Sequence, residues 1–424
     1  MTTRTQAPLD RLRAAVRKVI AMNQTSRVFT YFGAGAEPGV NARHMSADMR
    51  YNKTKETCNI RIVDYSAVSI TSKSMSNTQL INLLSDPQVS EKPSWAKVRW
   101  IDIGGISWDV IKMLSIKYKI HPLALENIMH THSKATTSKS DYYMQHLFLR
   151  ILCLELRDKD SAIPLLEVQR DATFNVEALD PTANASFSST RRKSKSIAYH
   201  NLESQDAAAT VQVEALKHRD RVECNVFPLF ILLFRDGTVI TLHRTISEKF
   251  TKPIINRLAR SDTLLRTTSD ASFLVQSLLD LTVDKALGLA EACETKLKKF
   301  EKQLLLKPDV DTVGNLHILA GDINLHQRAL EPLKRVIYGL RRYDIDRCLA
   351  LLNLPPEEEK DAVVKGYISP KAQIYLADVF DHIDYVLASL DKVYNLSENL
   401  MSYSFNVRCS YDIQKNLSAY QLDS

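Results

Sequence analysis

The sequence contains no apolar run that is long enough to cross a bilayer. A membrane-spanning helix needs roughly 18 or more consecutive apolar residues. The longest apolar segment covers only residues 227–234, which suits a buried strand. We therefore expect the chain as given to be soluble.

Cysteine pairs and catalytic motifs are also absent. The six cysteines are scattered without a CxxC pair, which argues against a thiolate metal site or a disulfide framework and favours a reducing compartment. No Walker loop, nucleophile elbow, HExxH motif or paired-carboxylate constellation occurs. The sequence therefore gives no support for an enzyme.

The charge is modest, with a formal net value of +7 over 424 residues. Aromatic residues are not interleaved with basic clusters, so we expect no nucleic-acid partner. An apolar fraction of 45% and a charged fraction of 25% are ordinary for a folded protein. This length predicts two or three domains.

Residues 1–96 lack a strong period and are expected to be variable and largely disordered. Only residues 59–65 alternate like a strand. The first twenty residues are basic with a weak apolar stripe, which favours a mobile tail over a mitochondrial presequence.

Residues 97–250 carry alternating strand and helix patterns, which predict an α/β (α+β) domain. A polar insert at about 180–205 buries nothing and is expected to be disordered. The hairpin turn Asp236-Gly237 connects the last two predicted strands. We predict helices at 108–118 and 123–130 and strands at 98–103, 145–156, 211–216, 222–234 and 238–243.

The remaining chain is almost entirely helical in pattern. Residues 251–368 predict an antiparallel helical layer that packs on the α/β domain, with a break at Lys307-Pro308-Asp309. Residues 369–424 predict one extended stalk helix that Ser369-Pro370 opens. Apolar positions three and four apart give this helix a seam that we expect to face partner helices and to mediate oligomerisation. The seam residues are Leu376, Val379, Ile383, Val386, Leu390, Val393 and Leu400.

Several separated stretches resemble the CorA family of magnesium channels, especially its fungal members. The sequences W-I-D-I-G-G at 100–105 and I-H-P-L-A-L-E-N at 120–127 are similar to the family pattern W-I-D … H-P-L-A-L-E-D, with Asn127 in place of the final Asp. V-I-T-L-H-R at 239–244 resembles L-L-T-V-H, and Y-L-A-D-V-F-D-H-I at 375–383 resembles R-D-V-Y-D-H in the stalk helix. Residues 404–412 resemble the approach to the first membrane helix.

The chain departs from this family at its end. CorA proteins carry two C-terminal membrane helices with a Gly-Met-Asn signature between them, and this sequence has neither. We therefore expect a cytosolic portion that stops before the first membrane helix, through truncation, splicing or a gene-model error.

The resemblance also implies a regulatory metal site. In the family, the residue matching Asp378 takes part in a divalent-metal site between subunits, so we predict Asp378 and Asp381 as ligands of a regulatory Mg²⁺. Mg²⁺ prefers oxygen ligands, which makes His382 the weaker candidate. A solvated acidic helix face is the alternative explanation for these two carboxylates.

Two functions remain open from the sequence. The first is the cytosolic metal-sensing part of a CorA-like magnesium or divalent-cation transporter, assembled with itself as a pentamer by resemblance and placed at the cytosolic face of a membrane. The alternative is a soluble helical scaffold or regulatory subunit that oligomerises, or that damps full-length CorA-type subunits, without conducting ions.

Overall fold

The computed structural model describes residues 38–129, 137–157, 221–244, 250–306, 309–352 and 364–422. The chain divides into two compact units. The first comprises Met1–Cys153, Val226–Ala286 and Arg328–Leu387, and the second comprises Leu154–Asn225, Leu287–Gln327 and Ala388–Ser424. None of the described helices combines the length and the apolarity that a bilayer crossing requires.

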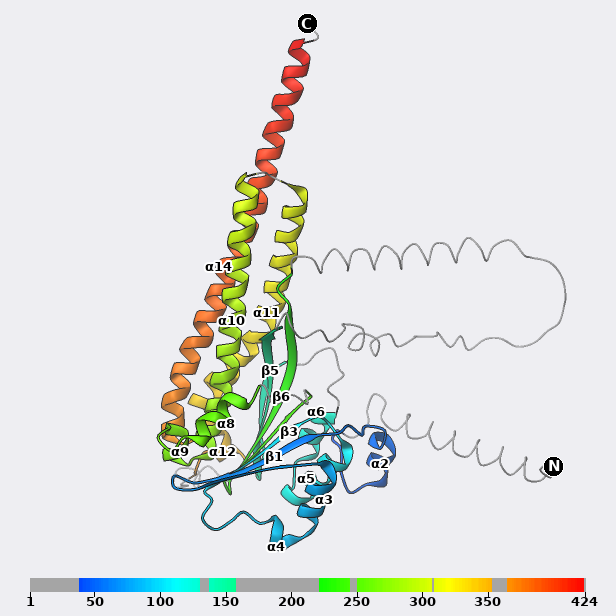
Figure 1. Ribbon diagram of the computed structural model, residues 1–424, viewed down its shortest axis with the longest axis vertical. Helices are drawn as coiled ribbons and strands as arrows, with labels where there is room; N and C mark the ends of the chain where they lie inside the picture. Colours follow the sequence, from blue (N-terminus) through cyan, green and yellow to red (C-terminus); the bar gives the residue numbers. More distant parts are fainter. Residues whose placement is uncertain are drawn as a thin grey trace, which may run out of the picture. The chain divides into compact units, whose positions relative to one another are not determined.

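A seven-stranded mixed sheet organises the described α/β region (Figure 1). Its strand order is β2-β1-β3-β7-β6-β5-β4. β3 and β7 are parallel, whereas β1 pairs antiparallel with β2 and β3, β6 with β7, and β4 with β5. The strands are β1 (Asn59–Tyr65), β2 (Ile70–Met75), β3 (Val98–Gly104), β4 (Lys139–Tyr142), β5 (His146–Leu156), β6 (Cys224–Phe234) and β7 (Thr238–His243).

The strands with a clear apolar pattern lie where the sequence predicted them. β1 and β7 have the predicted bounds, and β3, β5 and β6 differ from their predicted bounds by one or two residues. Gly237 adopts φ 85° in the turn between β6 and β7, where a Cβ would lie 2.6 Å from the carbonyl oxygen of Lys97. Glycine is therefore required at this turn. The strand predicted at 211–216 lies outside the described residues.

One face of the sheet is covered by helices from the N-terminal half. These are α2 (Met45–Tyr51), α3 (Asn77–Ser85), α5 (Trp108–Tyr118) and α6 (Pro122–Met129), with the short α4 (Pro87–Ser90) after α3. Their buried residues form one hydrophobic cluster with the strands, which includes Trp108, Ile101 and Phe230. The prediction of a largely disordered region over 1–96 is therefore wrong for residues 38–96. The predicted disorder of residues 1–37 and of the insert at 180–205 concerns residues outside the described ranges.

The opposite face of the sheet is also buried, and polar contacts tie it to the helical region. Asp102 of β3 accepts hydrogen bonds from Thr241 of β7 at 2.6 Å and from Thr251 at 2.7 Å. The indole of Trp100 donates to Thr241 at 2.9 Å. The hydroxyl groups satisfy the buried carboxylate, so this network holds neighbouring strands in register.

Six helices follow the sheet strands in the described part of the chain. They are α8 (Lys252–Ala259), α9 (Leu264–Thr268), α10 (Ala271–Leu306), α11 (Val310–Arg342), α12 (Asp344–Ala350) and α14 (Pro370–Leu422). The break between α10 and α11 and the start of α14 at Pro370 agree with the sequence prediction. In the first unit α14 contacts both long helices through aromatic ring pairs. Tyr375 of α14 packs against Phe273 of α10, and Phe380 of α14 packs against Tyr338 of α11.

The predicted oligomer seam packs inside the chain itself. Six of its seven residues are at most 2% exposed, and only Leu400 is half-buried. Ser397, which interrupts the apolar pattern, lies on the same buried face and donates to the carbonyl of Val393 at 2.8 Å. These side chains pack α14 against its own chain, so the buried part of the predicted seam is not exposed to a partner helix.

Candidate metal site

Two helices bring a cluster of acidic and imidazole side chains together in the first unit. Asp280 and Asp284 come from α10, and His382 comes from α14. One ligand atom from each of these three residues lies within 4.8 Å of the other two. Asp378 of α14 extends the cluster, because its Oδ1 lies 3.8 Å from Nε2 of His382.

The local sequence explains why each helix contributes two side chains. Asp280 and Asp284 are four residues apart on α10, and Asp378 and His382 are four residues apart on α14. Residues with this spacing occupy the same helix face, one turn apart. Each helix therefore presents two potential ligands at neighbouring heights.

A shared cap places the two helices in register. Ser369, just before α14, donates through its hydroxyl to Asp270, just before α10, at 2.5 Å. The backbone N–H of Ser369 donates to the hydroxyl of Ser272 at 3.0 Å. Both helices therefore start side by side and run in the same direction (Figure 1). Since each residue advances a helix by about 1.5 Å, Asp280 and Asp378 reach similar heights after comparable lengths.

Burial and like charge both act on Asp280. Burial raises the pKa of Asp280, and the charge of Asp284 raises it further, with a smaller contribution of the same sign from Asp378. Arg257 of α8, whose guanidinium lies 4.0 Å from the Asp280 carboxylate, and His382 both oppose the rise. The charged form of Asp280 is therefore disfavoured in the folded chain, mainly by burial, and a bound cation would favour it.

The donor set fits a divalent cation. Oxygen ligands of Mg²⁺ lie at about 2.0–2.1 Å from the metal, so opposite ligands are about 4.2 Å apart. Side-chain atoms that lie within 4.8 Å of each other need only small rotamer adjustments to reach such a geometry. Asp280, Asp284 and His382 would hold the ion, with Asp378 available for a fourth contact or for a bound water.

The structure places the predicted residues differently. Asp378 lies at the cluster, as a neighbour of His382, whereas Asp381 is exposed and lies outside it. His382, the weaker candidate from sequence, belongs to the three-residue core. Sequence reasoning missed Asp280 and Asp284, although two carboxylates four residues apart within the apolar run of α10 were an available signal.

His121 and Glu126 of the I-H-P-L-A-L-E-N stretch make structural contacts with neighbouring residues. His121 accepts from the backbone N–H of Leu123 at 3.2 Å and stacks on Tyr143 with ring centres 4.0 Å apart. Glu126 accepts from the backbone N–H of Gly39 at 2.7 Å. The His121 contact caps the start of α6, and the Glu126 contact holds the segment before α2 against α6.

A protein-family comparison identifies a relationship over about half of the chain. Residues 192–409 match the family model described as CorA-like Mg2+ transporter protein. The chain is also 22% identical over 284 residues to the cobalt/magnesium transport protein CorA of Thermotoga maritima. That match covers 67% of this chain and 56% of the relative, so the chain spans little more than half of its curated relative's length.

Solved structures show a similar fold at low sequence identity. The complete CorA magnesium transporter from Methanocaldococcus jannaschii superposes with a TM-score of 0.51 at 11% identity, covering 86% of this chain and 80% of that one. The full-length CmaX protein gives a TM-score of 0.52 at 11% identity, covering 87% and 82%. The mixed α/β domain followed by long helices is thus shared with both proteins.

Proposed function

Because the chain belongs to the CorA-like Mg2+ transporter family, we propose that it forms the cytosolic, metal-sensing part of a divalent-cation transporter. Members of this family are ion transporters and not enzymes. The proposed sensor is the cluster of Asp280, Asp284, Asp378 and His382 between α10 and α14. The proposed location is the cytosolic face of a membrane, with Mg²⁺ or a related divalent cation as the regulatory ligand.

One observation carries this proposal: residues about a hundred positions apart converge on a site rich in carboxylates. Three ligand atoms within 4.8 Å of one another can bind a single ion. A cation bound there would also crosslink α10 and α14, because ligands come from both helices. Metal occupancy would therefore control how firmly the long helices are held together, and this coupling is the proposed basis for sensing.

The imidazole of His382 bears on which cation binds. Mg²⁺ prefers oxygen ligands and keeps several waters, whereas imidazole favours Co²⁺, Ni²⁺ and Zn²⁺. We propose that the site accepts Mg²⁺ through its carboxylates and binds Co²⁺ more tightly through added coordination by His382. The cobalt/magnesium transport protein of Thermotoga maritima is a relative whose name includes both ions.

Thermal denaturation with and without metal tests the site. A ligand at a hundredfold excess over its Kd stabilises the folded state by about 2.7 kcal/mol. We expect Mg²⁺ and Co²⁺ to raise the melting temperature of the wild type relative to chelator, and Asp284→Asn to remove most of this shift. His382→Ala should weaken the response to Co²⁺ more than the response to Mg²⁺.

The matched control is Asp381→Asn, which changes an equally charged and exposed residue on the same helix outside the cluster. Its metal response should equal that of the wild type. An equal loss of response in Asp381→Asn and Asp284→Asn, or no response in the wild type, would refute the proposed site.

We also propose self-association through an exposed apolar stripe on α14. Ile374, Tyr385 and Leu396 are 70%, 64% and 42% exposed. They are spaced by eleven residues, which is close to three helical turns, so they share one face of the helix. Exposed apolar residues aligned in this way are typical of a helix-packing surface, with a second copy of the chain as the proposed partner.

Sedimentation velocity tests this interface. The wild type should form a larger species at high concentration, and Tyr385→Glu should shift it toward monomer. Tyr343→Glu is the control, because Tyr343 is also an exposed aromatic residue but lies outside α14. A wild type that is monomeric with metal and with chelator would contradict self-association of this chain.

A further inference from the structure

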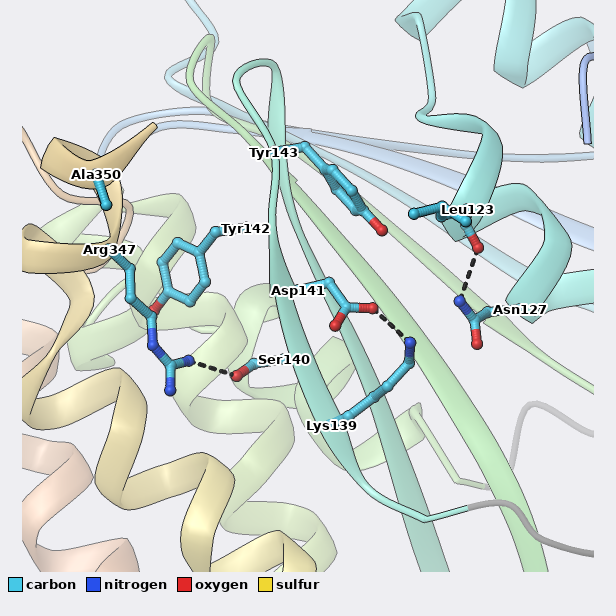
Figure 2. Close-up of a pocket in the computed structure, with 9 residues that line it drawn as sticks. All are labelled: Leu123, Asn127, Lys139, Ser140, Asp141, Tyr142, Tyr143, Arg347 and Ala350. Carbon is cyan, nitrogen blue, oxygen red and sulfur yellow. Dashed lines mark hydrogen bonds and ion pairs between the residues drawn. The ribbon is translucent and has the colours of Figure 1, made fainter. Parts of the chain in front are cut away.

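Among the described residues, the last strand of the sheet has an unpaired edge that lies in a groove. β4 pairs with β5 on one side and is the terminal strand in the sheet order. A groove of about 550 Å³ runs along it, lined by residues 139–143, by Leu123 and Asn127 of α6, and by Arg347 and Ala350 of α12 (Figure 2). All of these residues belong to the first unit.

The strand register shows which backbone groups face the groove. Tyr143 donates its backbone N–H to the carbonyl of His146 at 3.0 Å, so these two residues form a hydrogen-bonded pair. Hydrogen-bonded and non-hydrogen-bonded pairs alternate along an antiparallel ladder. Tyr142 opposite Leu147, and Ser140 opposite Leu149, are therefore non-hydrogen-bonded pairs. The backbone N–H and C=O groups of Tyr142 and Ser140 consequently point away from β5.

These outward groups lack partners in the part of the chain that the structure describes. No described residue makes a backbone hydrogen bond to the N–H or C=O groups of Ser140 and Tyr142. The groove therefore presents two donors and two acceptors in the spacing that an added strand requires. Such an edge, held between two helices, is the arrangement by which sheets receive extended peptides.

The two walls of the groove differ in chemistry. Ser140 and Tyr142 point toward α12, where Arg347 donates to the Ser140 hydroxyl at 3.0 Å and its guanidinium carbon lies 5.3 Å from the Tyr142 ring centre (Figure 2). Among the described residues no carboxylate forms a salt bridge with Arg347. This wall therefore favours an acidic side chain.

The wall on the α6 side is apolar at Leu123 and Tyr143 and carries one compensated pair of charges, Lys139 and Asp141 (Figure 2). Leu123 is 36% exposed beside Tyr143. Lys139 forms an ion pair with Asp141 at 2.6 Å, so the charges on this side already compensate each other (Figure 2). An apolar side chain from a ligand would pack against Leu123 and Tyr143.

We propose that this groove binds an extended peptide segment of a partner protein, in which acidic and apolar residues alternate. The peptide adds to the edge of β4 and pairs with the backbone of Ser140 and Tyr142. Successive side chains of a strand point to opposite faces. Its acidic side chains therefore meet Arg347, and its apolar side chains meet Leu123 and Tyr143.

The test measures, by fluorescence anisotropy, the binding of the full chain to a Val-Glu-Val-Glu-Val-amide probe that carries fluorescein at its N-terminus. We expect saturable binding that Arg347→Glu weakens by roughly tenfold or more, because a charge-assisted contact becomes a repulsive one. Arg342→Glu, a charge reversal at an exposed arginine outside the groove lining, should leave the affinity unchanged. A Val-Lys-Val-Lys-Val probe should bind more weakly than the acidic one.

Backbone pairing is tested independently. A probe that is N-methylated at the glutamates and another that is N-methylated at the valines should differ in affinity, since only one set of N–H groups faces β4. Ser140→Pro removes an outward donor without removing a β4–β5 ladder bond, so it should bind more weakly than Ser140→Ala, which also lacks the hydroxyl that Arg347 contacts, while the thermal melt persists. If Ser140→Pro does not fold, two comparisons still test the proposal: wild type against Arg347→Glu, and one N-methylated probe against the other. No saturable binding, or binding that is indifferent to Arg347→Glu and to both N-methylated probes, would overturn the proposal.

Discussion

At the scale of single residues, the ion pair between Asp64 and Arg99 is an internal crosslink of the sheet. The two residues oppose each other directly on β1 and β3. Arg99 contacts both carboxylate oxygens, at 2.7 and 2.8 Å, and donates to the carbonyl of Ser90 at 2.6 Å. Both side chains are almost fully buried. The pair therefore anchors the end of α4 as well as two strands.

Removal of one partner of this pair should be strongly destabilising. Asp64→Ala leaves a buried guanidinium without its counterion, which typically costs about 3–5 kcal/mol. Urea denaturation at neutral pH measures this loss as a lower free energy of unfolding. The double variant Asp64→Leu with Arg99→Met should be less destabilised than the single variant, because it leaves no buried charge. A single variant within about 0.5 kcal/mol of the wild type would contradict the assigned role.

His146 makes the fold sensitive to acid. Its side chain is fully buried, and its Nε2 accepts from the backbone N–H of His121 at 3.0 Å. Burial, together with the nearby His121, lowers the pKa of His146 to about 4. An unfolded histidine titrates near 6.5. Between these values the unfolded chain binds a proton that the folded chain does not, so stability falls as the pH is lowered through this window.

Through His146, the free energy of unfolding should fall by about 1.4 kcal/mol per pH unit below 6.5. His146→Gln keeps an acceptor for the His121 N–H and removes the titration. We expect the free energies of unfolding of wild type and variant, measured in urea, to converge or cross as the pH falls from 7 to 5. A constant difference between the two proteins over that range would show that His146 does not contribute this acid sensitivity.

At the scale of helices, the carboxylates of α10 oppose the stability of the metal-free protein. The raised pKa of Asp280 means that its charged form is disfavoured in the folded state. This penalty appears as the pH rises through that pKa and is fully present above it. Like charges four residues apart on a helix destabilise it by about 0.2–0.5 kcal/mol.

Asp280→Asn should therefore stabilise the chain in chelator by about 0.2–0.5 kcal/mol and reduce its stabilisation by metal. Thermal melts with chelator and with Mg²⁺ measure both effects. Asp381→Asn should change neither of them. A variant Asp280→Asn that is destabilised in chelator would indicate that the contact with Arg257, at 4.0 Å, outweighs the repulsion.

The elements that sequence predicted are those with a strong period. β1, β7 and α5 have their predicted bounds because their apolar residues alternate or recur at helical spacing. β2 was missed because Ile70–Met75 is exposed on both faces and carries no apolar alternation. Its place in the sheet comes from pairing with β1, which a local pattern does not encode.

In the candidate site too, local sequence predicted one part and long-range packing determines the rest. Asp378 was predicted from its position in the stalk helix, through resemblance to known sequences. Its partners Asp280 and Asp284 depend on how α10 packs beside α14, about a hundred residues away, and the shared cap of Asp270 and Ser369 sets that register. The structure supplies the partner carboxylates from α10, a helix.

At the scale of the whole chain, α14 has two faces with different roles. Its predicted seam is buried within the chain, which holds the helix in place. Ile374, Tyr385 and Leu396 remain exposed on the helix and supply the proposed interface with a second copy. The metal cluster at Asp378 and His382 links the same helix to α10. α14 therefore connects the proposed metal site with the proposed interface.

Isothermal titration calorimetry of the full chain with Mg²⁺ and with Co²⁺ tests the proposed metal site most directly. We expect saturable binding with one ion per chain, tighter for Co²⁺ than for Mg²⁺. Binding should be lost in the double variant Asp280→Asn with Asp284→Asn and unchanged in Asp381→Asn. Absence of binding to the wild type, or full retention of binding in the double variant, would contradict a divalent-cation site between α10 and α14.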